Sequence, residues 1–537
     1  MKKALLFVFL IIVLGISQAD DRFRPQYHLL PPSNWLNDPN GPVYYNGYYH
    51  MFFQYDPDSP VGIMKYWGHF YSKDMVHWIG LPIAIAPDQP YNINGIWTGS
   101  TSIVNGVPII IYTGINESHA QVQCQALPAN LTDPALSKWI KWPSNPLITS
   151  PNGRDPSTAF QDDHNNYYLI YGFDCDELGG QAVLFTSRDF VNWTYLHPIH
   201  SNHYDTFWEC SDIFNVSNRL VMKVSLRGQD FWAVGELDPI QKIFHPLAGD
   251  VDEYTQLIDQ GKFYASKSFY DPIHDQQVIV GWIGEDDDQG EKRGWQGMHS
   301  LPRSIFLSND GLQLGSRPIE ALQTLRVEES HRYFHNIVLP STIPFELVHD
   351  DLDFGLSVLS TLDGSQRTSV GMMTRTNTTF MPNWDVPGWD YFSVPGITNS
   401  LDCQHACDQD IKCRSWTFDS AKQMNNNCFL KSGIPNLVAS LTCTSGVKQS
   451  ETKQQQQLVW VYINRTLSQR SSGASRAPLA VVEVFESQGG RLAITTRVYP
   501  EEDTAQNLAV YVNSGSTTNQ TIVIDTLDIW TLNSIWT

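Results

Sequence analysis

Apolar residues along this chain occur in short runs rather than in long periodic stretches. Runs such as Tyr48–Phe53 and Val107–Tyr112 are rich in β-branched and aromatic residues, and Asn-Gly pairs at 46–47 and 105–106 precede them. Asn-Gly is the pair that two-residue hairpin turns favour. No long helical period interrupts this pattern, so the sequence predicts an all-β protein.

The runs recur at a nearly constant interval. One position marks the start of each unit, and successive markers stand 54 to 61 residues apart. Five β-repeats of this length predict a five-bladed β-propeller, in which the first strand of each blade lines the central axis. The markers should then meet at one end of that axis: Asp38, Gly99, Asp155, Glu209 and Lys267. The alternative is an ordinary β-sandwich with coincidental spacing.

A second repeated segment supports the propeller. The segment Ser72–Trp78 (SKDMVHW) recurs as Ser187–Trp193 (SRDFVNW) 115 residues later, which is about two units. We therefore expect equivalent turns in two blades that are separated by a third.

The repeat ends near residue 325, and the pattern then changes. Residues 341–537 show further short alternating strands, which predict a β-sandwich. Five of the eight cysteines fall between Cys403 and Cys443, a density typical of a small disulfide-stapled module in a secreted protein. The expected organisation is a signal peptide at 1–19, a propeller at 20–326, the sandwich at 341–537 and the insert within it at 382–449.

The N-terminus predicts secretion, because two lysines precede an apolar run from Ala4 to Leu14 and small residues up to Ala19 form a cleavage site. No later apolar stretch is long enough to span a membrane. We therefore expect a secreted protein, or one in a vacuole-like lumen, with no membrane span.

Seven sequons make N-glycosylation expected in a eukaryotic host: Asn116, Asn130, Asn192, Asn215, Asn377, Asn464 and Asn519.

Charge and ligand spacing narrow the function. The formal net charge is −21 and no basic stripe occurs, so nucleic acid is not an expected partner. No cluster of residues has metal-ligand spacing, so neither a metal nor another cofactor is expected and water is the only co-substrate.

Three of the five markers are carboxylates: Asp38, Asp155 and Glu209. A retaining glycosidase needs two carboxyl groups about 5 Å apart, one as nucleophile and one as acid/base. A third can bind sugar hydroxyls and tighten its hold as charge develops. A lone Asp-Pro is more often a turn, but three carboxylates at equivalent blade positions favour glycoside hydrolysis.

The motifs around these carboxylates resemble a known family. Trp35–Gly41 (WLNDPNG) is similar to the signature of glycoside hydrolase family 32, the invertases and fructan hydrolases, and nearest to its plant acid-invertase type. Arg154-Asp155-Pro156 and Trp208-Glu209-Cys210 resemble its second and third motifs in the same order. Further matches include Phe52–Tyr55, Trp97–Ser100 and Ala265–Asp271.

The resemblance implies a role for each matching position. Asp38 would be the nucleophile, Glu209 the acid/base, and Asp155 the carboxylate that binds fructose hydroxyls, with Arg154 keeping Asp155 ionised. Cys210 would be a buried thiol that tunes Glu209. The remaining matches would bind or enclose the sugar: Trp35, Asn37, Gln54, Trp67, Trp97, Ser100, Lys267 and Trp295.

Asp230 stands where plant-type invertases carry an aspartate linked to the glucose half of sucrose, which favours sucrose over long fructans. The alternative reading of Asp230 is a turn carboxylate at a strand end.

The implied reaction is release of terminal β-D-fructofuranosyl residues through a fructosyl-enzyme, from sucrose in the first place. The alternatives are a fructan exohydrolase or inulinase, a fructosyltransferase, and a non-catalytic carbohydrate-binding protein.

The cysteine-rich insert resembles a PAN/apple module, through its cysteine spacing and Trp416-x-Phe418. By that resemblance Cys403 would pair with Cys428 and Cys407 with Cys413, leaving Cys443 over. Such modules bind carbohydrate or protein, so the insert would tether the enzyme to a wall, matrix or partner, or be a passive addition.

Overall fold

The computed structural model describes most of the first 340 residues and, beyond them, mainly the regular elements. The described residues are 24–175, 179–201, 207–251, 256–285, 290–340, 352–360, 368–375, 381–385, 390–394, 399–409, 413, 415–419, 428–431, 438–447, 458–464, 480–485, 493–498, 507–514 and 521–529. The expected signal peptide at 1–19 and the sequons Asn377 and Asn519 lie outside them, as does the side chain of Asn464.

Five antiparallel sheets form the N-terminal part, one for each unit of the repeat. Blade 1 contains β1 (Asn34–Tyr45), β2 (Tyr48–Asp56), β3 (Tyr66–Ser72) and β4 (Trp78–Ile85). Blade 2 contains β5 (Ile96–Val104), β6 (Val107–Ile115), β7 (Gln121–Pro128) and β8 (Trp139–Lys141). Blade 3 contains β9 (Gly153–Arg154), β10 (Phe160–Gln161), β11 (Tyr167–Cys175), β12 (Gly179–Ser187) and β13 (Thr194–Ser201).

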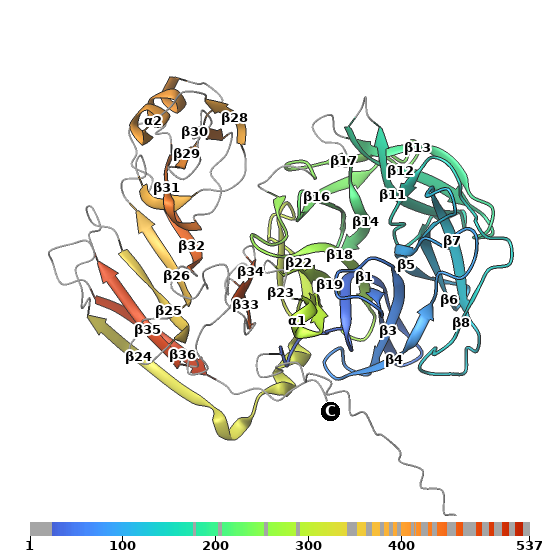
Figure 1. Ribbon diagram of the computed structural model, residues 1–537, viewed down its shortest axis with the longest axis horizontal. Helices are drawn as coiled ribbons and strands as arrows, with labels where there is room; N and C mark the ends of the chain where they lie inside the picture. The colour runs from blue at the N-terminus through green and yellow to red at the C-terminus, as the bar shows by residue number, and fades with distance from the viewer. Residues whose placement is uncertain are drawn as a thin grey trace, which may run out of the picture.

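Blade 4 contains β14 (Glu209–Val216), β15 (Arg219–Leu226), β16 (Gln229–Leu237) and β17 (Phe244–Pro246). Blade 5 contains β18 (Tyr264–Asp271), β19 (Gln276–Ile283), β21 (Met298–His299), β22 (Arg303–Leu307) and β23 (Leu314–Pro318). Figure 1 shows β1, β5, β14 and β18 around the centre of this part. The five-bladed β-propeller predicted from the spacing of the markers is therefore confirmed, and the sandwich alternative for this part is wrong.

Apolar side chains fill the spaces between neighbouring blades. One cluster of buried residues lies at each of the five blade-to-blade contacts. Between blades 1 and 2, for example, Phe52 and Trp67 pack with Ile110 and Tyr112. Burial of such faces is the main favourable contribution to folding, and it leaves the axis free for polar side chains.

The ring closes between the first and last blades. The short strand β20 (Trp295–Gln296), which follows helix α1 (Gly290–Arg293), pairs in parallel with β1 of blade 1. The backbone N–H of His299 also donates to the carbonyl of Leu29 at 2.9 Å. These bonds join two segments about 260 positions apart and hold blade 5 against blade 1.

The inner strands carry β-bulges at the markers. Register shifts occur between Leu36 and Pro39 in β1, between Ile96 and Gly99 in β5, between Glu209 and Asp212 in β14, and between Tyr264 and Lys267 in β18. In blade 3 the inner strand is interrupted after β9, and Asp155 has a φ of +68°. A bulge redirects side chains locally, so the repeated motif marks the same bend in each blade.

The second repeated segment also has a structural basis. In the turn between β3 and β4, Asp74 Oδ1 accepts from the backbone N–H groups of Val76 and His77, both at 2.8 Å. In the turn between β12 and β13, Asp189 Oδ1 accepts from the N–H groups of Val191 and Asn192, at 3.0 and 2.7 Å. These turns lie in blades 1 and 3, so the expectation of equivalent turns is confirmed.

Beyond the propeller, 3₁₀ turns (Glu320–Leu325 and Glu328–Ser330) lead into further antiparallel strands. The strands β24 (Arg332–Pro340) and β36 (Thr521–Ile529) pair with each other. A four-stranded sheet has the order β32-β26-β25-β35, and β33 pairs with β34. Their bounds are β25 (Leu352–Ser360), β26 (Thr368–Arg375), β32 (Leu458–Asn464), β33 (Ala480–Phe485), β34 (Ala493–Val498) and β35 (Asn507–Ser514). The strands expected in the sandwich are present, and the domain boundaries stay a prediction.

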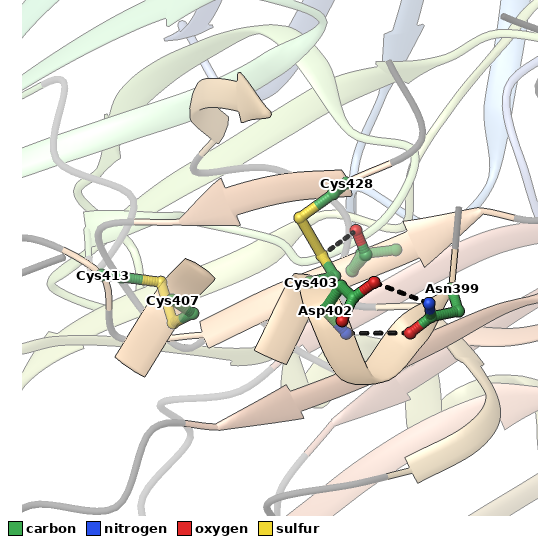
Figure 2. The surroundings of a disulfide bond; sticks show 7 residues. Asn399, Asp402, Cys403, Cys407, Cys413 and Cys428 are labelled. Atoms are coloured by element: carbon green, nitrogen blue, oxygen red, sulfur yellow. Dashed lines mark hydrogen bonds between the residues drawn. A yellow bond between two sulfur atoms is a disulfide. The ribbon is translucent and has the colours of Figure 1, made fainter. Parts of the chain in front are cut away.

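The insert forms a sheet of its own with one helix. Its strands run in the order β27-β31-β29-β30-β28. The elements are β27 (Met381–Asp385), β28 (Asp390–Val394), α2 (Ser400–Gln409), β29 (Ser415–Asp419), β30 (Cys428–Lys431) and β31 (Val438–Val447). Asn399 caps α2, because its side-chain oxygen accepts from the N–H of Asp402 at 2.9 Å (Figure 2).

Both disulfides implied by the PAN resemblance are present. Cys403 is bonded to Cys428 and Cys407 to Cys413 (Figure 2). All four cysteines are buried together with Trp416 and Leu430 in a small core. Cys443 lies in β31, and its side chain is not among those described. Within the described part of the chain, no helix is long and apolar enough to cross a membrane.

Candidate active site

Three carboxylates from three blades meet at one end of the propeller axis. Asp38 lies on β1, Asp155 directly follows β9, and Glu209 begins β14. The thiol of Cys210 touches two of them, with its Sγ 3.8 Å from Asp38 Oδ2 and 3.7 Å from Asp155 Oδ2. Arg154 connects the other pair, with Nε 3.8 Å from Asp155 Oδ2 and Nη2 2.6 Å from Glu209 Oε1. The predicted convergence of the three carboxylates is confirmed.

Asp38 is held by three hydrogen-bond donors. Asn37 Nδ2 donates to its Oδ1 at 2.9 Å, and Gln54 Nε2 donates to its Oδ2 at 3.2 Å. The hydroxyl of Thr98 also donates to Oδ2. Burial, and then the charge of Asp155, raises the pKa of Asp38 to about 6, while the bonds from Thr98 and Asn37 oppose that rise. The carboxylate is thus ionised only above mildly acidic pH.

Asp155 is the most enclosed of the three carboxylates, with 5% of its side chain exposed. Its Oδ2 accepts from the backbone N–H of Cys210 at 2.9 Å. Its own N–H donates to the hydroxyl of Thr113 at 3.0 Å, which fixes its left-handed backbone. Burial raises the pKa of Asp155, and the charge of Arg154 counteracts this.

Glu209 is more open, with 33% of its side chain exposed. Arg154 binds its Oε1, and the hydroxyl of Tyr264 donates to its Oε2. Burial, followed by the charge of Glu209, raises the pKa of Tyr264, so this phenol keeps its proton. The charge of Arg154 lowers the pKa of Asp155, as the expectation that it keeps Asp155 ionised requires, and the same guanidinium also binds Glu209.

Cys210 does not lie where sequence reasoning placed it. Its sulfur is wedged between Asp38 and Asp155, whereas the expectation was that it tunes Glu209. Burial and the two carboxylates raise its pKa well above the usual value. The thiol therefore stays protonated and can donate weakly to either neighbour, because both carboxylates are acceptors.

Four of the residues expected to bind or enclose the sugar lie close to the three carboxylates. Asn37 and Gln54 bond to Asp38 and to each other, at 3.0 Å between Asn37 Nδ2 and Gln54 Oε1. Trp35 Nε1 donates to Asn37 Oδ1 at 2.5 Å. Trp97 is partly exposed, and the guanidinium of Arg154 lies 5.7 Å from its ring centroid.

The other four of these residues are buried around the site. Trp67 is 0% exposed in the core between blades 1 and 2, and its Nε1 donates to the carbonyl of Trp97 at 3.0 Å. Trp295 is 3% exposed on β20. Ser100 Oγ and Lys267 Nζ both donate to the carbonyl of Pro156, at 2.8 and 3.3 Å. Ser100 and Lys267 hold two inner strands to the segment after β9, whereas the two tryptophans are enclosed by their neighbours, so the part expected of these four residues in binding or enclosing the sugar stays a prediction.

Asp230 is also corrected. Its side chain is 0% exposed. Its two carboxylate oxygens accept from the backbone N–H groups of Ala265 and Ser266, at 3.1 and 2.9 Å, and Lys223 Nζ is 3.4 Å away. The carboxylate therefore holds β18 of blade 5 against β16 of blade 4, and it does not face the mouth of the site.

Sequence reasoning missed Thr98 and Tyr264, which touch Asp38 and Glu209 directly. Both lie in the bulges of their inner strands, one residue before Gly99 and three residues before Lys267. A search of the residues next to each marker would have found them. Among the described residues, no group of three His, Cys, Asp or Glu is placed to hold a metal ion.

Comparison with known families agrees with this geometry. Residues 28–318 match the family model described as glycosyl hydrolases family 32 N-terminal domain, and residues 480–531 match its C-terminal domain. Residues 384–431 match a PAN domain.

Similar proteins include both β-fructofuranosidases and fructan hydrolases. A β-fructofuranosidase, insoluble isoenzyme, of Arabidopsis thaliana is 33% identical over 95% of this chain and 90% of its own. A fructan 6-exohydrolase of Beta vulgaris is 40% identical over 57% of this chain and 56% of its own. The crystal structure of fructan 1-exohydrolase IIa from Cichorium intybus superposes with a TM-score of 0.71 at 27% identity, covering 96% and 98% of the two chains.

Proposed function

The chain belongs to glycoside hydrolase family 32 and is a β-fructofuranosidase-like enzyme, and we propose that it hydrolyses sucrose by a double displacement at Asp38. The observation that carries this proposal is the position of Asp38 and Glu209, which come from blades 1 and 4 and are linked through Asp155. Cys210 Sγ lies between Asp38 and Asp155, and Arg154 bridges Asp155 and Glu209. Such a pair is what a retaining mechanism needs.

In the first step Glu209 gives its proton to the glycosidic oxygen while a carboxylate oxygen of Asp38 attacks the anomeric carbon of fructose. The bond to the leaving sugar breaks with its electron pair, and a covalent fructosyl-enzyme forms. In the second step Glu209 takes a proton from water, and the resulting hydroxide displaces Asp38. Fructose leaves, and both carboxyl groups return to their starting states.

Asp155 is proposed to bind fructose hydroxyls. Its enclosed carboxylate and the adjacent cation of Arg154 form a preorganised pair beside the reacting carbon. Hydrogen bonds that strengthen as positive charge develops on the sugar lower the barrier. Asn37 and Gln54 orient Asp38, and Tyr264 orients the Glu209 oxygen that is not paired with Arg154.

The choice of sucrose rests on the relatives that align over nearly the whole chain, because the β-fructofuranosidases of Arabidopsis thaliana and Daucus carota both cover 95% of it. A second candidate is a fructan exohydrolase. The Beta vulgaris and Cichorium intybus enzymes favour it, and one structure of the latter is described as a complex with 1-kestose.

Product analysis distinguishes these substrates. The protein is incubated with sucrose, 1-kestose, inulin and levan, at low and high sugar concentration, and released fructose is measured. We expect the highest kcat/KM with sucrose. A higher value with 1-kestose or levan would identify a fructan exohydrolase, dominant trisaccharide formation would identify a transferase, and no fructose from any of them would leave only carbohydrate binding.

The protein is proposed to act outside the cell, since relatives of Pisum sativum and Arabidopsis thaliana carry the descriptions cell wall isozyme and insoluble isoenzyme. The PAN-like insert would then tether the enzyme to wall carbohydrate or to a protein partner.

A further inference from the structure

A cavity lies beside the end of β14 that is farther from Glu209. It has a volume of about 800 Å³ and is lined by residues of blades 3, 4 and 5. Strand β14 leads from Glu209 at the active-site end to Asn215 at this cavity, a path of about 20 Å at 3.3 Å per residue. The volume is within the range of 300–1,000 Å³ that small-molecule sites occupy.

The lining has the chemistry that binds neutral sugars. Phe160 and Tyr270 supply aromatic surface, and Tyr270 is 54% exposed. Gln161 and Gln277 supply amides for hydroxyl groups. Aromatic side chains with a few convergent polar groups suit a ligand that has both C–H faces and hydroxyls.

Charge excludes anionic ligands. The described residues that line this cavity include Asp212 and Glu236 but no lysine or arginine. Glu236 is paired with Arg219, which is outside the lining. A phosphate or carboxylate group would therefore meet two carboxylates and no basic side chain of the lining, which favours a neutral ligand.

One residue of the lining is itself a sequon. Asn215 is exposed, and it begins the sequence Asn215-Val216-Ser217 at the end of β14. Its backbone is paired with Leu220 of β15, so its position at the rim of the cavity is fixed by the sheet. The structure therefore places a sequon beside an aromatic-lined cavity whose described lining has no basic side chain.

We propose that the N-linked glycan of Asn215 folds into this cavity and that its first sugars pack against Tyr270 and Phe160. The attachment is made in the secretory pathway from a lipid-diphosphate-linked oligosaccharide. A bond forms between Asn215 Nδ2 and the anomeric carbon of the first N-acetylhexosamine, the lipid diphosphate leaves, and the amide loses one proton. The inference depends on secretion and not on the enzyme's activity.

The matched control is Asn130. It is also an exposed sequon, with Thr132 Oγ1 donating to Asn130 Oδ1 at 2.8 Å, but it lies in the loop after β7 and is not part of the lining. A glycan at Asn130 therefore has no such cavity beside it.

The test is trimming of the native glycoprotein by an endoglycosidase, followed by mass spectrometry of each glycopeptide. The full chain is produced in an N-glycosylating host. We expect the Asn215 glycan to be removed at least tenfold more slowly than the Asn130 glycan, and both to be removed equally fast after denaturation. Equal rates in the native protein, or an unoccupied Asn215, would overturn the proposal.

Two variants connect the protection to the cavity. Tyr270→Ala removes exposed aromatic surface, and we expect the Asn215 glycan to be trimmed as fast as the control in this variant. Asn215→Gln should lower Tm by several degrees, whereas Asn130→Gln should leave it unchanged. If Tyr270→Ala keeps full protection, the glycan lies elsewhere. Sucrose turnover, measured in parallel, should be the same in all variants.

Discussion

At the scale of single residues, the two carboxylates proposed to react, Asp38 and Glu209, have different neighbours. Asp38 receives hydrogen bonds from three side chains, but its burial and then the charge of Asp155 raise its pKa to about 6. Glu209 is bound by a guanidinium on one oxygen and by a phenol on the other. A pair of carboxylates in unlike surroundings is the usual basis for dividing the roles of nucleophile and acid.

The hydroxyl of Thr98 is expected to set the acid limb of the pH profile. The nucleophile must be ionised, so kcat/KM should fall as pH drops through the pKa of Asp38, about 6. Thr98→Val removes a bond that favours the ionised form, and the acid limb should move to higher pH by up to about one unit. Thr98→Ser, which keeps the hydroxyl, should behave like the unchanged protein. An unshifted limb in Thr98→Val would contradict this role.

Tyr264 is expected to position Glu209 for proton transfer. Tyr264→Phe removes the hydrogen bond that orients the Glu209 carboxyl group, and kcat for sucrose should fall by ~10- to 100-fold. The loss should be much smaller with an aryl fructoside, whose good leaving group needs little protonation. A general structural defect would lower both rates alike. Steady-state kinetics with the two substrates decides between these outcomes.

The polar residues around the three carboxylates were harder to predict than the carboxylates themselves. Thr98 and Ser100 share one motif, but the bulge between Ile96 and Gly99 directs the first to Asp38 and the second to the carbonyl of Pro156. The sequence shows which side chains are present, but it does not show the β-bulge that sets the direction in which each of them points. The three carboxylates were predictable because they recur at the same bend in the repeat.

At the scale of elements, the contact between blades 4 and 5 depends on a buried ion pair. Lys223 of β15 and Asp230 of β16 are both 0% exposed, and Lys223 Nζ also donates to the carbonyl of Ser266 at 2.7 Å. Removing one member of a buried pair leaves the other charge uncompensated.

Asp230→Asn is therefore expected to act on stability and not on substrate choice. The free energy of unfolding should fall by about 3 kcal/mol or more, seen as a lower denaturation midpoint. The ratio of kcat/KM for sucrose to that for 1-kestose should not change. Glu236→Gln, on the same strand with 62% of its side chain exposed, is the control. An unchanged midpoint with a raised KM for sucrose would mean that Asp230 contacts the glucose unit after all.

The larger elements followed from the sequence, whereas the shortest ones did not. Blades were predictable because turn pairs and apolar runs recur at fixed spacing. The closing strand β20 has two residues and no periodic pattern, and it exists because β1 offers it a free edge. Likewise, the family resemblance implied the disulfides of the insert, although cysteine spacing alone leaves their connectivity open.

At the scale of the whole molecule, the PAN-like insert is a structural unit of its own and contributes none of the three carboxylates. Its strands form a sheet of their own, with a core built around two disulfides. We expect a Cys407→Ser/Cys413→Ser double variant to keep sucrose turnover within about twofold, because both cysteines lie in the separate core of the insert and not in the propeller that carries the three carboxylates. Its retention on insoluble cell-wall polysaccharide should drop. Retention equal to that of the unchanged protein would contradict the tether.

The propeller also explains how carboxylates 171 positions apart can act on one bond, since their strands begin at the same end of one axis.

The most direct test of the proposed double displacement is to trap its intermediate. Glu209→Gln is mixed with an aryl fructoside, quenched and digested, and the peptides are weighed by mass spectrometry. One added fructosyl unit on Asp38 is predicted, because the first step proceeds without acid help and the second lacks its base. A fructosyl unit on another residue, or undiminished sucrose turnover by Asp38→Ala, would contradict the account.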